Sequence, residues 1–355
     1  MRLPTRLSSL VVALALAPDT GGAQTTHARW APQITEARAA IEGAMAGGAA
    51  PAASVAVAVD GEVVWSQAFG DATPDSRFGI GSISKALTLT AVMRLVDSGA
   101  LDLDEPVERY LLDWPHAGQG ITIRRLASHQ SGLGDDFADR HYTSTTHFPD
   151  LDSAYRHIRN ERLVYPPGSR SVYATGLFTI VGRILERTTG ESYPELMRRL
   201  VFEPAAMRRT LPNDPRSPPP KRVTFYVRDD GRVRKAPAAD PSFKLPGAGF
   251  LSTAEDLARF GSALLLPKFL SEAAREEMFR PVPLTDGTPT EYALGFQSLT
   301  ENGRRVLLQP GGGPGIAGWL AIYPERRVVV AILTNLTGSS LGGGPRRAVA
   351  ESFLR

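Results

Sequence analysis

Ser82 and Lys85 are the two residues of this sequence whose types and spacing point most directly to chemistry. They stand three positions apart in the segment GSISK at 81–85, and on a helix residues at i and i+3 share one face. Ser82 would begin that helix, where free N–H groups and the helix dipole disfavour a cation. This setting lowers the pKa of Lys85 and helps to activate the serine hydroxyl as a nucleophile. The alternative is a serine cap followed by a surface lysine.

A tyrosine further along the chain offers a proton acceptor. Tyr173 follows a turn with the sequence PPG at 166–168 and precedes an expected helix, so its side chain can be aimed into a cleft. Beside a lysine, its phenol can ionise and act as a general base. The alternative is a packing aromatic residue, with Thr175 as the N-cap of the helix.

A glycine-rich segment supplies candidate backbone donors. Gly311 to Gly315 follow Gln309 and Pro310 after an expected strand, and glycines at a strand edge allow a backbone to approach a ligand closely. The N–H of Gly312 can then pair with the N–H of Ser82 as an oxyanion hole, which holds the negative oxygen formed in acyl transfer. The alternative is an ordinary loop between strands.

Hairpin patterns near both chain ends predict the sheet that would position these residues. Asp60-Gly61 joins two runs of alternating residues, 53–59 and 62–69. Asp-Gly is a strong signal for a two-residue turn, because both positions need a positive φ. Two further hairpins are predicted: 292–300 with 304–309 around Asn302-Gly303, and 318–323 with 327–333 around Pro324-Glu325.

Helical patterns occupy the middle of the chain. The predicted helices cover 82–97, 177–189 and a segment that opens with the capping box STAE at 252–255 and runs to about Leu266. The sequence therefore predicts an α+β fold, in which one antiparallel sheet is built from both chain ends and a mostly helical domain is inserted between them. The predicted domains are a discontinuous α/β sheet domain, 24–77 and 285–355, and a helical domain, 78–284, which carries Ser82.

Composition excludes several classes of protein. The chain has 355 residues, no cysteine, and 40 Lys+Arg against 37 Asp+Glu. Without cysteine there can be no disulfide, thiol nucleophile or cysteine-ligated zinc. The basic residues form no tract, so a nucleic-acid partner has no support, and no metal or other cofactor is expected.

Residues 1–23 resemble a targeting segment. Arg2 and Arg6 precede an apolar run from Leu7 to Ala17 that is too short to span a bilayer, and small residues follow at 21–23. This pattern predicts a signal peptide cut after Ala23, and hence a periplasmic or secreted protein without a membrane span after cleavage. The alternatives are a membrane anchor or a mistranslated leader.

Five segments occur in an order that is typical of one known family. They are 78–85, LASHQSGL at 126–133, YAT at 173–175, 247–255 and 311–315. With them the chain resembles the serine β-lactamase-like superfamily of the class C β-lactamase and DD-peptidase type, and in particular its mitochondrial-type serine β-lactamase-like branch. The resemblance implies a β-lactamase/transpeptidase-like fold, with the active site between sheet and helical domain. It also implies acyl transfer through a serine ester, without a metal.

The resemblance assigns roles to individual residues. Ser82, Lys85 and Tyr173 match the family's nucleophile, lysine and tyrosine base. Thr175 stands where the family usually has Asn, and it keeps one hydroxyl as donor and acceptor. By the same resemblance, Thr175 is a substrate-binding candidate.

The third motif of the family is altered in this chain. Gln309, Pro310 and Gly311 stand where Lys or His, then Thr, then Gly are usual. Gln309 carries no charge and Pro310 has neither hydroxyl nor N–H, although Gln309 and Gly311 remain substrate-binding candidates. A charge-assisted hydrogen bond is worth about 1.5–3 kcal/mol. We therefore expect esters or uncharged amides to be better substrates than carboxylate-bearing β-lactams.

Two functions are compatible with these features. The first is an exported serine hydrolase that acts through an acyl-serine intermediate on ester or amide substrates, including peptides and β-lactam-like compounds. The second is a catalytically weak or inactive protein of the penicillin-recognising fold with a binding or self-assembly role, as the altered third motif allows. The expected partner is a small molecule or peptide with a reactive carbonyl, and the resemblance also allows copies of the chain to associate.

Three other patterns do not support a site. Gly313 to Gly318 fit G-x-G-x-x-G, but a strand-like run follows instead of a helix. His129 could belong to a Ser-His-Asp triad, but no G-x-S-x-G elbow accompanies it, which favours a structural histidine. The acidic residues and histidines between 135 and 150 are irregularly spaced, which predicts a solvated loop at the cleft mouth instead of a metal site.

Overall fold

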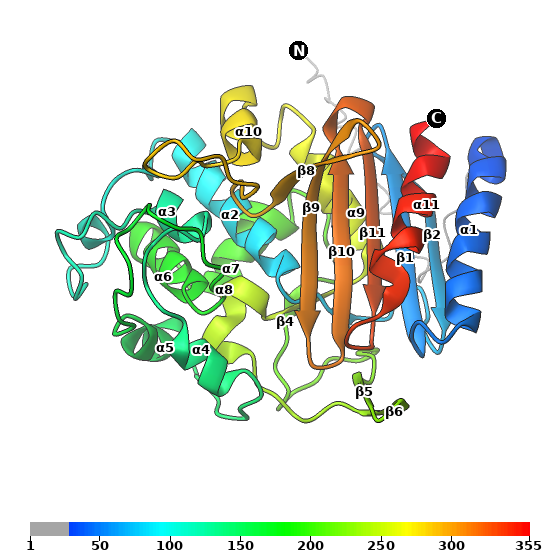
Figure 1. Cartoon of the computed structure of the whole chain (residues 1–355), viewed down its shortest axis with the longest axis horizontal. Coiled ribbons are helices and arrows are strands. Elements are labelled where there is room, and N and C mark those ends of the chain that lie inside the picture. The colour runs from blue at the N-terminus through cyan, green and yellow to red at the C-terminus, as the bar shows by residue number, and fades with distance from the viewer. Residues whose placement is uncertain (1–27) are drawn as a thin grey trace, which may run out of the picture.

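A six-stranded antiparallel sheet forms the centre of the computed structural model, which describes residues 28–355 (Figure 1). The predicted signal peptide at 1–23 lies outside the described residues. The strand order is β2-β1-β11-β10-β9-β8, so both ends of the chain contribute and the predicted α+β fold is confirmed. The strands are β1 (Ala52–Val59), β2 (Glu62–Gly70), β8 (Gln297–Glu301), β9 (Arg304–Gly313), β10 (Ile316–Tyr323) and β11 (Val328–Thr334).

The three predicted hairpins are present, but the strand predicted over 292–300 begins only at Gln297 and one turn differs. Asp60 and Gly61 have φ of 51° and 91°, as a type I′ turn requires, and the same signature recurs at Asn302-Gly303. Between β10 and β11 the connection is not a two-residue Pro-Glu turn but the 3₁₀ turn η5 (Pro324–Arg326), followed by Arg327 at φ 51°.

Helices cover both faces of the sheet, which explains why every residue of β1 is buried. On one face, Val55 and Val57 belong to an apolar cluster with α1 (Ala31–Ala46) and α11 (Gly344–Leu354). On the other face, Ala56 and Ala58 belong to a cluster with α9 (Ala254–Leu264). α9 lies within the predicted helical segment 78–284 but packs against β1 and β11. The domain limits themselves stay a prediction.

The remaining helices gather beside β8 and β9, on the side of the sheet away from α1 (Figure 1). At their centre lies α2 (Ile83–Asp97), which is buried along most of its length. It contacts β9 and three helices, namely α6 (Phe178–Thr189), α8 (Leu245–Ala248) and α10 (Glu272–Phe279). Within residues 28–355, no helix combines the length and the apolar character that crossing a membrane requires. The other helices of this region are α3 (Ile123–Ala127), α4 (Asp136–His141), α5 (Leu151–Ile158) and α7 (Tyr193–Met197).

Short elements complete the structure and connect the helical region to the sheet. A three-stranded sheet has the order β3 (Phe78–Gly79), β7 (Phe250–Ser252), β4 (Leu211–Pro212). Its strand β3 comes immediately before α2 in the chain. A fourth hairpin, β5 (Tyr226–Asp229) with β6 (Arg232–Lys235), turns at Asp230-Gly231 and was not predicted, although it carries the Asp-Gly signal. The helical turns are η1 (Ala28–Trp30), η2 (Val107–Arg109), η3 (Arg198–Phe202), η4 (Ser242–Lys244) and η6 (Ser340–Gly342).

Candidate active site

Ser82 lies at the point where β3 gives way to α2. The chain turns there through Gly81, whose φ of 49° is in the left-handed region that favours glycine. A Cβ at Gly81 would lie 2.6 Å from the nitrogen of Gly312, so β9 passes directly beside this turn. Ser82 itself is half-buried, whereas the residues on either side of it are buried. The hydroxyl is therefore presented at the start of a rigid helix next to the backbone of β9.

Lys85 occupies the next turn of α2, on the same side as Ser82. Its side chain is only 1% exposed, and Nζ donates to Ser82 Oγ at 3.0 Å, Thr175 Oγ1 at 3.1 Å and the Gly247 carbonyl at 3.0 Å. Burial lowers the pKa of Lys85 from 10.5 to about 7, and the charge of Asp135 opposes this shift only in part. The main cause is thus desolvation rather than the helix dipole on which the sequence argument relied.

Tyr173 reaches the same hydroxyl from a different element. Its hydroxyl donates to Ser82 Oγ at 2.6 Å, and the Lys85 ammonium lies 4.7 Å from the centre of its ring. Tyr173 is 45% exposed as a whole, but the protein atoms packed around its phenol partly desolvate it and raise its pKa, while hydrogen bonds with Ser82 and Thr175 and the nearby Gln309 side chain oppose that rise. Ser82 Oγ, Lys85 Nζ and the Tyr173 hydroxyl therefore form one cluster, which is the arrangement that the enzymatic interpretation required.

His129 holds Tyr173 in place instead of contacting Ser82. The two rings lie 4.4 Å apart, and His129 accepts from the Ala174 N–H through Nδ1 at 3.3 Å and from the Val172 N–H through its carbonyl at 2.8 Å. Burial and the charge of Lys85 lower the pKa of His129 to about 3. At neutral pH it is therefore an uncharged support for the tyrosine.

Asp135 corrects one expectation from the sequence, which placed it in a solvated loop. Its carboxylate accepts from the N–H groups of Thr175 at 2.6 Å and Gly176 at 3.0 Å. A Cβ at Gly176 would lie 2.5 Å from Asp135 Oδ1 and 2.9 Å from the Ala138 Cβ, so a side chain there would displace this carboxylate. Burial raises the pKa of Asp135 to about 6 despite these hydrogen bonds. Asp135 thus anchors the segment that carries Tyr173 and Thr175, and no spacing in the sequence pointed to this role.

The glycine-rich segment that begins at Gln309 forms the end of β9. β8 pairs with β9 only from Arg304 to Leu308, so the residues from Gln309 onward face the helical region. Gln309 is 5% exposed, and its Nε2 donates to the neighbouring Pro310 carbonyl at 3.0 Å. A Cβ at Gly311 would lie 2.0 Å from the Ile80 carbonyl oxygen. The absence of a side chain at Gly311 therefore lets β9 lie against the turn that carries Ser82.

The two adjacent glycines of β9 allow a matched test of this contact. Gly311→Ala places a methyl group against the Ile80 carbonyl, whereas a Cβ at Gly312 meets nothing within 4 Å. We expect Gly311→Ala to lower the melting temperature and to reduce ester hydrolysis by about 100-fold, because small misplacements in an active site have effects of this size. Gly312→Ala should leave the melting temperature unchanged. Thermal denaturation and steady-state kinetics of both variants check this, and equal behaviour of the two would contradict the packing argument.

Comparison with known proteins identifies the family to which these features belong. A family model described as Beta-lactamase matches residues 37–352. The chain belongs to the beta-lactamase family. The human "Serine beta-lactamase-like protein LACTB, mitochondrial" is 25% identical over 85% of this chain and 76% of its own length. The D-aminopeptidase of Gluconobacter oxydans is 28% identical over 84% of this chain and 59% of its own length.

A solved structure agrees with the family assignment. The octameric penicillin-binding protein homologue from Pyrococcus abyssi superposes with a TM-score of 0.75 and 26% identity, over 90% of this chain and 77% of that one. The predicted relationship to the serine β-lactamase-like superfamily, and the β-lactamase/transpeptidase-like fold, are thereby confirmed. Hydrolases among the relatives, including the D-aminopeptidase, show that this beta-lactamase family member is a serine hydrolase.

Proposed function

We propose that the protein is an exported hydrolase that cleaves esters or amides through an acyl intermediate on Ser82. The observation that carries this proposal is the position of Ser82 Oγ, 3.0 Å from Lys85 Nζ and 2.6 Å from the Tyr173 hydroxyl. A weak nucleophile becomes reactive when a group that can take its proton lies within hydrogen-bond distance. Export rests on the sequence pattern at 1–23.

The directions of the pKa shifts divide the proton transfers between Lys85 and Tyr173. Since the pKa of Lys85 falls to about 7, a substantial fraction of its amine is neutral at physiological pH and can accept the serine proton. The pKa of Tyr173 is raised, so its phenol stays protonated and can donate to the leaving group. This assignment differs from the one drawn from the sequence, in which Tyr173 removes the proton together with Lys85.

The remaining steps use groups that lie around the same hydroxyl. Attack of Ser82 Oγ on the carbonyl forms a tetrahedral intermediate, whose oxygen we place between the N–H groups of Ser82 and Gly312. Tyr173 protonates the departing oxygen or nitrogen and is reprotonated from Lys85 through the cluster. Water then attacks the acyl-Ser82 ester with the same groups acting in reverse. Thr175 and Gln309 flank the reacting groups as substrate contacts.

A substrate panel with mass detection tests this function. The panel contains a 4-nitrophenyl ester of a neutral acid, a D-amino acid amide and a chromogenic cephalosporin. The amide is included because two proteins similar to this chain are named for action on D-amino acid compounds. We expect an acyl adduct on the peptide that contains Ser82. We also expect cephalosporin turnover about 10- to 100-fold below that of the ester, because Gln309 offers no charge to its carboxylate.

Two outcomes of the panel would contradict the proposal. Failure of every substrate to form an adduct would favour the second function, a binding or self-assembly protein. For that function the octameric relative from Pyrococcus abyssi is the model, and the mass of the protein in solution tests it. Faster turnover of the cephalosporin than of the ester would contradict the role given to Gln309.

A further inference from the structure

A cavity of about 580 Å³ opens beside Gly312, and the proposed reaction leaves it unused. Gly312 and Gly313 of β9 and Ala248 of α8 form part of its wall, and Tyr142 and Lys244 form another part. The cavity therefore begins at the proposed oxyanion hole and extends from it along the segment 213–241, with Lys244 in its wall. Gly312 is the one proposed site residue in its lining, so a group that extends from the reacting carbonyl past Gly312 reaches the cavity.

The wall of this cavity carries four cations and, among the described residues that line it, no carboxylate. Lys221 forms an ion pair with Asp75 outside the cavity, and Arg222 donates to Asn213 Oδ1 at 3.2 Å. Lys235 is exposed to solvent. The cavity thus presents a positive surface on which, in the part of the chain that the structure describes, Lys221 alone has an ion-pair partner.

Lys244 differs from the other three cations because it is buried. Its side chain is 6% exposed, and in residues 28–355 its ammonium has no hydrogen bond or ion pair. The ammonium lies 3.9 Å from the ring centre of Tyr142, a contact that attracts a cation but does not neutralise it. Burying an unpaired charge is costly. An anion that entered the cavity would therefore gain a partner that the fold itself does not provide.

The charge of Lys244 is present under physiological conditions. Burial and repulsion by Lys85 lower the pKa of Lys244 to about 8, and the negative charge of Asp135 opposes the shift. Most of the ammonium is consequently protonated at neutral pH.

The position of the cavity indicates which part of a substrate would occupy it. Gln309 precedes Gly312 on β9 and lies close enough to the Tyr173 hydroxyl to affect its pKa. Since Tyr173 is the proposed proton donor to the leaving group, the leaving group belongs on the Gln309 side. The acyl side chain must then extend past Gly312 and Gly313 toward Lys244.

We infer that Lys244 binds a carboxylate on the acyl portion of the substrate, so that the enzyme prefers acids with a second, anionic end. The inference rests on the proposed acyl-serine function and names the substrate class of that same site. It also complements the altered third motif, because the positive charge missing at Gln309 is supplied by Lys244 from η4 on the other side of Gly312.

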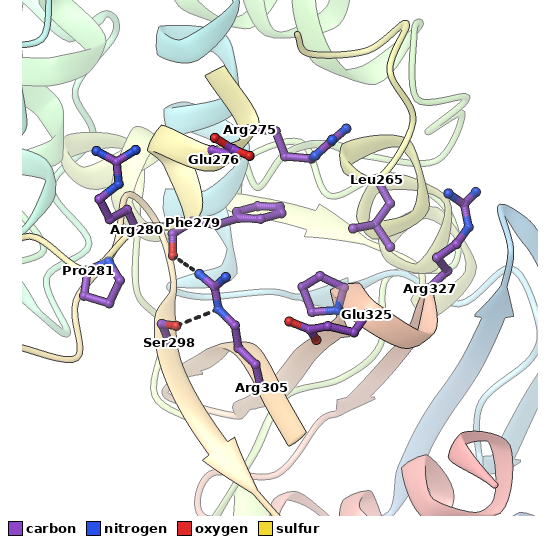
Figure 2. A pocket seen from close by; sticks show the side chains of 11 residues that line it. Leu265, Arg275, Glu276, Phe279, Arg280, Pro281, Ser298, Arg305, Glu325 and Arg327 are labelled. Carbon is purple, nitrogen blue, oxygen red and sulfur yellow. Dashed lines mark hydrogen bonds between the residues drawn. The ribbon is translucent and has the colours of Figure 1, made fainter. Parts of the chain in front are cut away.

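A second cavity, of about 810 Å³, shows that cationic walls alone do not justify such an inference (Figure 2). It lies between α10 and η5, and none of the proposed catalytic residues lines it. Arg305 there donates to Ser298 Oγ at 3.2 Å and to the Phe279 carbonyl, and Glu276 and Glu325 stand in the same wall. Carboxylates thus stand among the cations of this wall, and Arg280 and Arg327 pair with Glu277 and Asp60, whereas the wall around Lys244 holds no carboxylate.

Matched esters that differ only in charge test the inference. A series of dicarboxylic acids of increasing length is prepared as mono-4-nitrophenyl esters, each with its second carboxyl either free or capped as a methyl ester. For the wild-type protein we expect the best free acid to exceed its capped partner in kcat/KM by about 10- to 100-fold. Lys244→Met should reduce this ratio to about 1 through KM, and should change the capped ester by less than about twofold, since methionine fills a similar volume without charge.

Lys235→Met is the matched control, because this exposed lysine lines the same cavity and its loss should leave the ratio unchanged. The inference is overturned if the wild-type protein does not distinguish free from capped esters, or if Lys244→Met slows both equally. If no ester forms an adduct, the proposed function fails separately, and Lys244 is then judged by calorimetric binding of the free dicarboxylate. That binding should be present in the wild-type protein and lost in Lys244→Met; equal binding by both overturns the inference.

Discussion

Replacing Ser82 with alanine should lower kcat/KM for a 4-nitrophenyl ester by about 10⁴-fold or more and abolish the acyl adduct. The substitution removes one oxygen, which is the atom that both Lys85 Nζ and the Tyr173 hydroxyl contact. Losing the nucleophile of a serine hydrolase costs several orders of magnitude, because the remaining groups then have nothing to activate. Stopped-flow absorbance for turnover and intact mass for the adduct measure the two effects.

Ser171→Ala is the control for this experiment. Ser171 lies two residues before Tyr173, and its hydroxyl donates to the Ser128 carbonyl at 3.1 Å. We expect this variant to form the acyl adduct and to keep its melting temperature. That result would show that loss of a nearby serine is not enough to abolish acylation. An adduct that persists in Ser82→Ala and maps to another residue would show that Ser82 is not the nucleophile.

The parts of the fold that follow from local signals were predictable from the sequence. Asp60-Gly61 and Asn302-Gly303 form turns because both positions need a positive φ, and this requirement is visible in two residues. The capping box places the start of α9 to within one residue: the N-cap is Thr253, whose Oγ1 accepts from the Asp256 N–H, instead of Ser252. The 3₁₀ turn at Pro324–Arg326 was missed because the positive φ falls on Arg327, a residue type that gives no turn signal.

The candidate site shows the same division between local and long-range features. The spacing of Ser82 and Lys85 is a helical property, so their contact could be predicted from α2 alone. The roles that we give to Asp135 and Lys244 depend on which segments fold over them, and no local pattern reports burial by a distant element. One feature of the sequence could have drawn attention to Lys244: it is one of five lysines in a chain whose other Lys and Arg positions are all arginine. Lysine can adapt to burial by losing its proton, whereas arginine cannot.

Lys85→Met should reduce kcat/KM for the same ester by about 10³-fold or more, because it removes the group that can accept the serine proton. In the wild-type protein, activity should rise with pH through about 7, where Lys85 becomes neutral, and this rise should vanish in the variant. Lys85→Arg is the companion substitution: it keeps the charge but cannot lose its proton, so it should be equally inactive. An active Lys85→Arg variant would show that a neutral amine is not required.

Lys85→Met should stabilise the protein although it lowers activity. A gain in stability together with a loss of activity distinguishes a catalytic lysine from a structural one. Burial lowers the pKa of Lys85 from 10.5 to about 7, so the unfolded state binds the proton more tightly than the folded state. The resulting penalty is on the order of 5 kcal/mol at or below pH 7 and falls to nothing as pH rises to 10.5.

Methionine removes that penalty but leaves the Gly247 carbonyl without its donor, at a cost of about 1–3 kcal/mol. Urea unfolding should therefore show Lys85→Met to be more stable than the wild-type protein by a few kcal/mol at pH 7, with the advantage shrinking toward pH 10. A variant that is less stable at pH 7, by an amount that does not change with pH, would mean that the three hydrogen bonds of Lys85 outweigh its desolvation. The lysine would then serve the fold, and its proton would not be available for chemistry.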